Sequence, residues 1–228
     1  MVVVGTGPEV NAAFAHYCEA IFELAEDEVD VIQARVAERL GVSRPAVSEM
    51  MRRLETEGLV KLGARICLTV RGFQLAESVV RRHRLAERML TDILGLSWAE
   101  AHIEASRWEH VLSPAVEAAI NRLLGDPTTC PHGNPIPGSA YSAPQTVLLS
   151  DIPAGGRFVV SRIPEELEFT PGLLEFLEGA FVTPGNFGRV TARSPDGTLT
   201  VEVRENYVGI GQFAATRIMV SALEPAGR

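Results

Sequence analysis

Residues 36–60 read VAERLGVSRPAVSEMMRRLETEGLV, and this stretch decides the fold of the N-terminal third of the chain. The pattern predicts a short helix over residues 33–40, a turn at Gly41, and a second helix that Ser43 caps and Gly58 closes. Two helices joined by so short a turn are typical of a helix-turn-helix, whose second helix enters the major groove of DNA.

The segment LVKLGARICLTVRG, residues 59–72, alternates apolar and polar side chains and turns at Gly63, which predicts a two-stranded wing. In such a motif the start of the second helix meets base edges and phosphate oxygens. Small apolar side chains such as Pro45 and Ala46 suit the methyl group of thymine. The candidate DNA contacts are Gln33, Ser43, Arg44, Pro45, Ala46, Ser48, Glu49 and Arg52.

The charge of the chain is unevenly distributed. The formal net charge of -8 disfavours a nucleic-acid partner, yet residues 33–88 hold 12 Lys and Arg against 6 Asp and Glu. Because salt screens charges beyond about 10 Å, a local basic face can still bind phosphates. A solvated helix surface, or a plain three-helix core, would have a similar composition, so charge leaves these interpretations open.

Composition limits the class of protein. The chain has no apolar run long enough to cross a bilayer and no basic segment followed by an apolar run at its start. Its three cysteines lie far apart without a Cys-x-x-Cys pair, which disfavours disulfides and a structural zinc cluster. We therefore expect a cytoplasmic protein with no membrane partner.

The C-terminal part has a different pattern. Residues 125–149 contain five prolines and three glycines, which predicts an extended linker rather than a helix. Several short strand patterns follow, with a hairpin signal at Pro195-Asp196-Gly197 and a short helix or turn at residues 171–179. Short strands at this density suggest a small barrel.

Four of the five histidines have a carboxylate near them on a predicted helix. Residues 102–110 read HIEASRWEH, and at about 100° per residue the side chains of His102, Ser106, Glu109 and His110 share one stripe. His83 and Glu87 stand four residues apart, and His16 and Glu19 three apart, whereas His132 in the linker has no such neighbour. Imidazole and carboxylate together suit Mn²⁺, Fe²⁺ and Zn²⁺. Each pair alone could equally be a surface ion pair or a helix–helix contact.

The chain resembles the diphtheria toxin repressor family of metal-dependent repressors. The resemblance lies in residues 36–60, in RRHRLAERML at 81–90, in HIEASRWEHVLS at 102–113 and in DPTTCPHGNPIPG at 126–138. It implies a mainly α fold with β: a winged helix-turn-helix domain over residues 1–77, a helical metal-binding and dimerisation domain over 78–145 ending in the Pro-rich linker, and an SH3-like β-barrel over 146–228.

The resemblance also implies two metal sites. An ancillary site would use His83, Glu87, His102, Glu165 and Glu168, and a primary site would use His16, Glu19, Ser106, Glu109 and His110. Iron-type members have methionine and cysteine where this chain has His16 and Ser106, and manganese-type members have aspartate and glutamate. Loss of both sulfur ligands favours harder ligands, so we expect Mn²⁺ as the effector, with Fe²⁺ as the alternative.

The predicted function is metal-dependent transcriptional regulation. Metal binding would set the angle of the recognition helices, so that a homodimer binds a palindromic operator of metal-homeostasis genes. One alternative is a winged-helix regulator that responds to another signal without metal. A metallohydrolase is a second alternative, but the sequence has no His-Glu-x-x-His and no nucleophile beside a base. We therefore expect neither an enzyme nor a small-molecule substrate.

Overall fold

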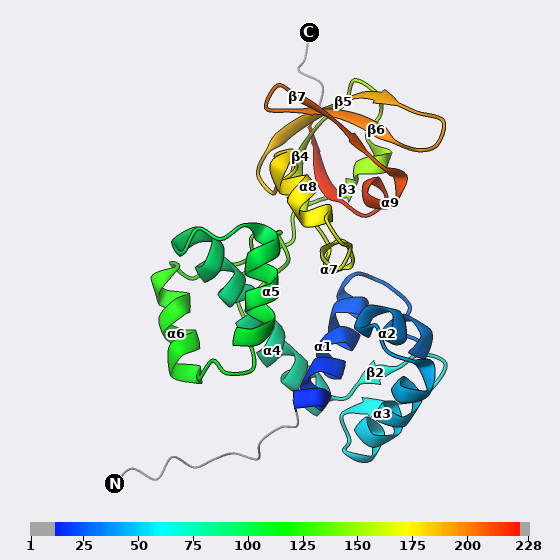
Figure 1. The fold of residues 1–228 in the computed structure, drawn as a ribbon, viewed down its shortest axis with the longest axis vertical. Helices are drawn as coiled ribbons and strands as arrows, with labels where there is room; N and C mark the ends of the chain where they lie inside the picture. Colours follow the sequence, from blue (N-terminus) through cyan, green and yellow to red (C-terminus); the bar gives the residue numbers. More distant parts are fainter. Residues whose placement is uncertain (1–11, 224–228) are drawn as a thin grey trace. The chain divides into compact units, whose positions relative to one another are not determined.

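The computed structural model describes residues 12–223, and the chain divides into two compact units, Met1–Val80 and Arg81–Arg228 (Figure 1). The boundary between the units falls within helix α4, Val70–Arg88. The three domains predicted with boundaries after residues 77 and 145 stay a prediction.

The N-terminal unit is a winged helix-turn-helix. Its elements are α1 (Ala12–Glu26), α2 (Gln33–Leu40), α3 (Arg44–Thr56), β1 (Val60–Lys61), β2 (Cys67–Leu68) and the first part of α4. Gly41 caps the C-terminal end of α2 in the left-handed conformation, with a φ of 62°. Ser43 caps the start of α3, where its hydroxyl accepts a hydrogen bond from the Ala46 amide at 3.4 Å. The predicted helix pair and its caps are therefore confirmed.

Burial of one face of each helix holds this unit together. Val36 of α2 and Met51 of α3 are fully buried beside Ile21 of α1, and the wing adds Val60 and Ile66. Strands β1 and β2 pair antiparallel, with Val60 opposite Leu68, which confirms the predicted wing. Because α1, α2 and α3 share one core, a shift of α1 is transmitted to α3 by direct packing.

The second unit begins with helices. Helix α4 continues into a π-helical turn, Met89–Ile93, and is followed by α5 (Trp98–Trp108) and α6 (Pro114–Leu123). A capping box between Ser97 and Glu100 starts α5. The helix ends at Trp108, so Glu109 and His110 lie in the following turn, and the helical stripe predicted for residues 102–110 holds only for its first part.

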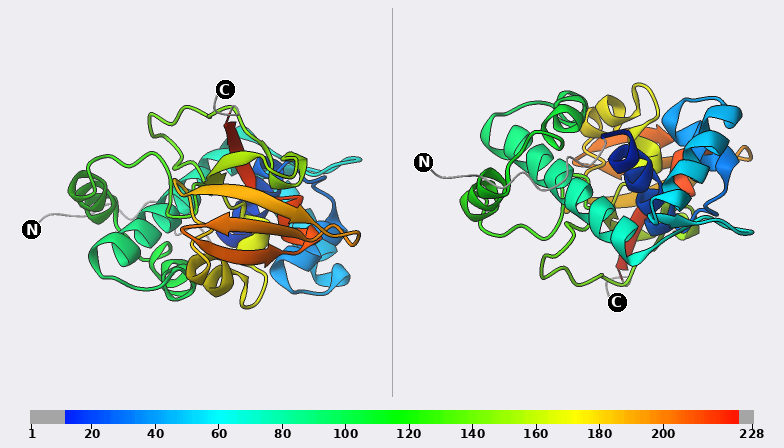
Figure 2. Two further views of the ribbon diagram at one scale, coloured as in Figure 1. Left: turned by 90° about the horizontal axis from the view of Figure 1, so that it is seen from above. Right: turned by 90° about the horizontal axis from the view of Figure 1, so that it is seen from below.

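Six antiparallel strands form the C-terminal sheet, in the order β3-β8-β4-β5-β6-β7. Figures 1 and 2 show this sheet in colours from yellow-green to red. Its elements are β3 (Val147–Leu148), a 3-10 turn (Leu149–Asp151), β4 (Arg157–Arg162), α7 (Glu165–Glu168), α8 (Leu173–Gly179), β5 (Phe187–Arg193), β6 (Leu199–Val203), β7 (Asn206–Ile210), α9 (Gln212–Ala215) and β8 (Met219–Leu223). The hairpin predicted at Pro195-Asp196-Gly197 joins β5 to β6 and is confirmed.

The barrel core extends beyond the strands. Phe158, Val190 and Val201 are fully buried in it, and Trp98, the first residue of α5, packs in the same cluster. The Trp98 amide donates to Glu178 Oε2 of α8 at 3.1 Å. Helix α5 is thus anchored in the barrel at its N-terminal end.

The first half of the predicted linker is not a linker. Cys130, His132 and Asn134 are buried in a tight loop closed by a bridge between Thr129 and Pro135, and Ile136 is buried directly after it. The Ile163 amide donates to the His132 carbonyl at 2.8 Å, which holds the loop against the end of β4. The prediction failed because proline excludes a helix but does not exclude a buried loop.

Between residues 12 and 223, no helix combines the length and the apolarity needed to cross a membrane.

Candidate metal centre

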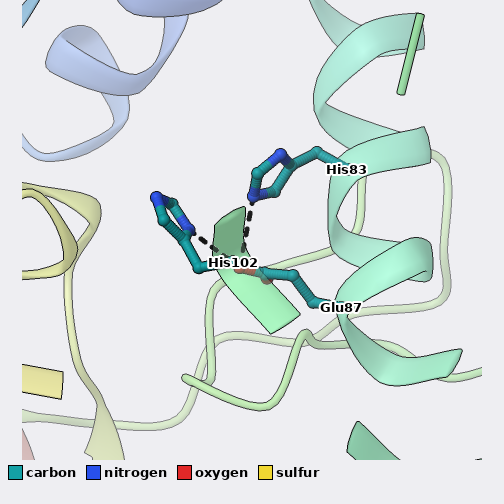
Figure 3. Close-up of side chains that lie close together, drawn as sticks. All are labelled: His83, Glu87 and His102. Atoms are coloured by element: carbon teal, nitrogen blue, oxygen red, sulfur yellow. Dashed lines mark hydrogen bonds and ion pairs between the residues drawn. The ribbon is translucent and has the colours of Figure 1, made fainter. Parts of the chain in front are cut away.

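A buried carboxylate, Glu87, lies at the centre of a histidine cluster in the second unit. Its Oε1 atom lies 3.2 Å from His83 Nε2, 3.1 Å from His102 Nδ1 and 3.5 Å from His132 Nδ1. His83 and Glu87 share a face of α4 because they are four residues apart, and His102 comes from α5 (Figure 3). Three separate segments therefore place imidazoles around one carboxylate oxygen.

The barrel adds a second carboxylate. Glu168 of α7 places Oε2 3.1 Å from His102 Nδ1 and 3.0 Å from His132 Nδ1. The Asn134 side chain donates to Glu168 Oε1 at 2.7 Å and to the Ile163 carbonyl at 3.0 Å. The loop after α6 and the barrel are thus joined at the same histidines.

Burial and ion pairing have opposite effects on the pKa values of these groups. Burial lowers the pKa of His83 and of His132, but the neighbouring carboxylates outweigh it and hold each pKa well above 6.5. Burial also lowers the pKa of His102, yet its hydrogen bonds to Glu168 and Glu87 outweigh this effect and raise the pKa to about 10. Burial raises the pKa of Glu168, but His132 lowers it to about 2. The carboxylates of the cluster therefore favour the protonated form of these imidazoles.

The residues of the cluster fit a divalent ion. Glu87 Oε2 and His132 Nε2 are buried polar atoms without a hydrogen-bond partner, although such atoms are normally paired. The groups His83–Glu87–His102 and Glu87–Cys130–His132 each bring three ligand atoms within 4.8 Å of one another. Imidazole nitrogens and carboxylate oxygens in this number suit Mn²⁺, Fe²⁺ or Zn²⁺.

Sequence reasoning missed two members of this cluster, Cys130 and His132. The Cys130 sulfur lies 3.8 Å from His132 Nδ1, and both side chains are fully buried. The motif Cys-Pro-His, with two ligand types two residues apart, was the available signal. A sulfur ligand is therefore present in the cluster, but burial and Glu87 raise the pKa of the Cys130 thiol and disfavour its thiolate form.

Glu165, a predicted ligand, is engaged by a cation of the chain itself. Its Oε1 atom accepts hydrogen bonds from Arg84 Nε at 3.2 Å and from Nη2 at 3.0 Å. Burial and Glu168 raise the pKa of Glu165 to about 7, against the lowering effect of Arg84. Glu165 Oε2 is buried without a hydrogen-bond partner. One carboxylate oxygen of Glu165 lies within 4.8 Å of ligand atoms of His102 and Glu168.

The residues predicted for the primary site lie in both units. In the second unit, Glu109 Oε2 lies 2.6 Å from His83 Nδ1, and Glu109 Oε1 lies 3.3 Å from His110 Nε2. The exposed Ser106 hydroxyl donates to the His102 carbonyl of its own helix at 3.1 Å. In the first unit, His16 Nδ1 lies 3.5 Å from Glu19 Oε2, and the His16 side chain is 54% exposed.

The predicted DNA contacts lie at the start of α3 and near it. Ser43, Arg44, Pro45, Ala46, Glu49 and Arg52 are exposed, whereas Gln33 and Ser48 are half-buried. The Ser48 hydroxyl accepts a hydrogen bond from Arg52 Nη2 at 3.3 Å. Most of these side chains are therefore available to a partner of the N-terminal unit.

Gly133 is the residue that allows the histidine loop to approach the barrel. Its φ is 87°, and a Cβ there would lie 2.3 Å from the Ser161 carbonyl oxygen. We expect Gly133→Ala to lower the free energy of unfolding by about 3 kcal/mol, since backbone strain and a steric clash add together. Urea denaturation measures this loss. The control is Gly138→Ala in the same segment, where φ is 71° and the nearest atom is 3.9 Å away. Its expected loss is about 1 kcal/mol, and equal losses would contradict the steric argument.

Metal binding at this cluster is expected to release protons. The raised pKa values keep His83, His102 and His132 protonated at neutral pH, whereas a metal ligand must be a neutral imidazole. Apparent metal affinity should therefore rise with pH, by about tenfold per pH unit for each proton released. Calorimetric titration in two buffers of different ionisation enthalpy counts the protons. A heat that is independent of the buffer would contradict this account.

Comparison with known proteins agrees with this geometry. Residues 12–65 match the iron-dependent repressor N-terminal DNA-binding domain, residues 69–138 the iron-dependent repressor metal-binding and dimerisation domain, and residues 147–222 the FeoA domain. The chain is 39% identical over 201 residues to the iron-dependent repressor IdeR of Mycobacterium bovis, covering 82% of this chain and 86% of that protein. It is 48% identical over 124 residues to the diphtheria toxin repressor of Corynebacterium diphtheriae, covering 54% of this chain and 55% of that one.

Solved structures give the same result. A manganese-dependent transcriptional repressor in complex with manganese superposes with a TM-score of 0.82 at 33% identity, covering 92% of this chain and 100% of that one. The manganese regulator SloR superposes with a TM-score of 0.72 at 28% identity, and the match covers 92% of this chain and 98% of SloR. The predicted mixed fold, and the prediction of a regulator rather than an enzyme, are confirmed. A DNA-binding domain and a metal-binding, dimerising domain are joined in one chain, which belongs to the diphtheria toxin repressor family of metal-dependent transcriptional repressors.

Proposed function

We propose that this protein is a manganese-responsive repressor. Mn²⁺, or Fe²⁺ as the alternative, would promote binding of a homodimer to a palindromic operator and so control genes of metal homeostasis in the cytoplasm. The observation that carries the proposal is the convergence of His83, His102 and His132 on Glu87. Such a buried cluster of ligand groups is costly for a protein to keep without a cation.

The choice of metal rests on the donor atoms. The cluster offers imidazole nitrogens and carboxylate oxygens, and the one thiol, Cys130, is held in its neutral form by burial and by Glu87. Neither His16 nor Ser106 supplies sulfur. Harder donors favour Mn²⁺ over the softer ions. The manganese-dependent repressor among the solved structures supports this choice, whereas IdeR supports the iron alternative.

We propose two sites in each protomer. His83, Glu87, His102, His132 and Glu168 would hold one ion, and His16, Glu19, Ser106, Glu109 and His110 would hold another. A bound ion supplies a positive charge that links ligand groups of separate segments. The domain boundaries proposed for this arrangement are residues 1–77, 78–145 and 146–228.

The response to metal would pass through α1. His16 and Glu19 occupy one turn of this helix, and its buried face packs with α2 and α3 around Ile21, Val36 and Met51. Fixing α1 therefore limits the positions open to the recognition helix. Metal then favours DNA binding because it binds one arrangement of these helices better than the others.

The test compares operator affinity with and without metal. Genomic fragments selected by the protein in Mn²⁺ provide the DNA, and gel shifts in Mn²⁺, anaerobic Fe²⁺, Mg²⁺ or a chelator measure affinity. We expect tight binding in Mn²⁺ and loss of binding in chelator or Mg²⁺. Binding that ignores the chelator would indicate a metal-independent winged-helix regulator instead. Arg44→Ala is the control, because it should weaken DNA binding while calorimetry still finds the metal bound.

A further inference from the structure

The histidine cluster has enough ligands for more than one ion. Among the described residues of the second unit, the groups His83–Glu87–His102, Glu87–Cys130–His132 and His102–Glu165–Glu168 each bring three ligand atoms within 4.8 Å of one another. Glu87 and His102 each belong to two of these groups. The overlapping sets thus share one carboxylate and one imidazole, and two-metal centres likewise hold two ions close together.

A buried arginine lies where a second cation would be expected. The Arg84 side chain is 0% exposed, and its Nε and Nη2 atoms donate to Glu165 Oε1 at 3.2 and 3.0 Å. A guanidinium keeps its charge at any ordinary pH, so its burial requires an anion beside it. Glu165 provides that anion.

The charges of the cluster then balance for one divalent ion. In their ionised forms, Glu87, Glu165 and Glu168 carry three negative charges and Arg84 carries one positive charge, so two negative charges remain. With neutral imidazoles, one divalent cation cancels this remainder, and a second would leave two uncompensated positive charges in a buried site. Glu109 does not contribute to this charge balance, because it contacts His83 Nδ1, whereas Glu87 contacts Nε2 on the other side of the ring.

The same guanidinium fixes the two segments that carry ligands. Arg84 Nη1 donates to the Pro135 carbonyl, and Pro135 closes the loop that contains Cys130 and His132. Its bond to Glu165 holds the start of α7, whose last residue is Glu168. The neighbouring Glu166 is held separately by Arg217, at 2.7 and 3.1 Å.

We propose that Arg84 acts as a built-in cation that neutralises Glu165 and so limits this cluster to one divalent ion. Arg84 is thus a positioning residue that determines the number of ions bound. The inference rests on the proposed function only in requiring that the cluster bind a divalent ion.

The test counts Mn²⁺ ions per protomer in the full-length protein by equilibrium dialysis and elemental analysis, and measures affinity by calorimetry. Arg84→Gln should bind one ion more than the parent protein, because Glu165 and its charge become available. Glu165→Gln should keep the parental number but bind about tenfold more weakly, because Arg84 is left unneutralised. The double variant R84Q/E165Q should recover both the parental number and the parental affinity.

Two results would overturn the proposal. The first is that Arg84→Gln binds only as many ions as the parent. The second is that the double variant binds no more tightly than Glu165→Gln, as expected if Glu165 is a ligand. If circular dichroism finds Arg84→Gln unfolded, R84M/E165L replaces the pair by apolar side chains of similar size, a change that proteins often tolerate. Parental ion number and affinity in that variant support the proposal, and a loss of affinity above tenfold contradicts it. A parent protein that binds no Mn²⁺ would contradict both the proposed function and this inference, whereas the results above contradict this inference alone.

Discussion

Glu109→Ala is expected to abolish the increase in operator affinity that metal produces, a loss on the order of 100-fold. The Glu109 carboxylate is buried, and its two oxygens face His83 Nδ1 at 2.6 Å and His110 Nε2 at 3.3 Å. Its removal takes away one of the two carboxylates of the proposed primary site and leaves His83 without one of its two carboxylate neighbours. Gel shifts with and without Mn²⁺ measure the ratio of affinities.

The matched control is Glu104→Ala, which removes a half-buried carboxylate of α5 that pairs with the exposed Arg107. This variant should keep the metal response, since a surface ion pair contributes at most about 1 kcal/mol to stability. Circular dichroism establishes that both variants are folded. Full metal stimulation of Glu109→Ala would remove this residue from the site.

Glu87→Gln should lower the affinity of the histidine cluster for Mn²⁺ by 100-fold or more. The substitution keeps the size of the side chain and an acceptor oxygen, but it removes the charge that three imidazoles share. Calorimetric titration gives the affinity. Trp98 offers a second readout, because its ring centroid lies 4.6 Å from that of His132 and a paramagnetic ion there should quench its fluorescence.

Glu77→Gln on the same helix is the control for this change, since Glu77 precedes the cluster by more than one turn. It should leave both the affinity and the quenching unaltered. Comparable weakening in both variants would mean that the overall charge of α4, rather than contact with the ion, sets the affinity.

Local chemistry explains which elements could be predicted. The helix-turn-helix depends on Ser43 as a cap, Gly41 as a left-handed turn and one apolar face per helix, and these signals lie within a few residues of the structure they specify. His83 and Glu87 belong to the same class, because their spacing on one helix places them together. The hairpin between β5 and β6 likewise follows from its turn residues.

The members missed by sequence reasoning depend on distant partners. His132 is buried because Ile163 binds its carbonyl and Glu168 faces its ring, and both residues lie about thirty positions further along the chain. The sequence pattern within residues 125–149 cannot predict contacts with such distant residues. Glu165 was predicted as a ligand from the family resemblance, and nothing in the sequence indicated its ion pair with the buried Arg84 side chain.

Helix α5 belongs both to the core of the barrel and to the candidate metal centre. Trp98 at its start is part of the barrel core, His102 one turn later contacts Glu87 and Glu168, and Glu109 follows its last residue. A chain cut after residue 145 would lose the apolar neighbours of an indole ring together with a metal-facing carboxylate. The barrel is therefore not an interchangeable module. A chimera that imports the barrel of a relative would have to import the first turn of α5 with it.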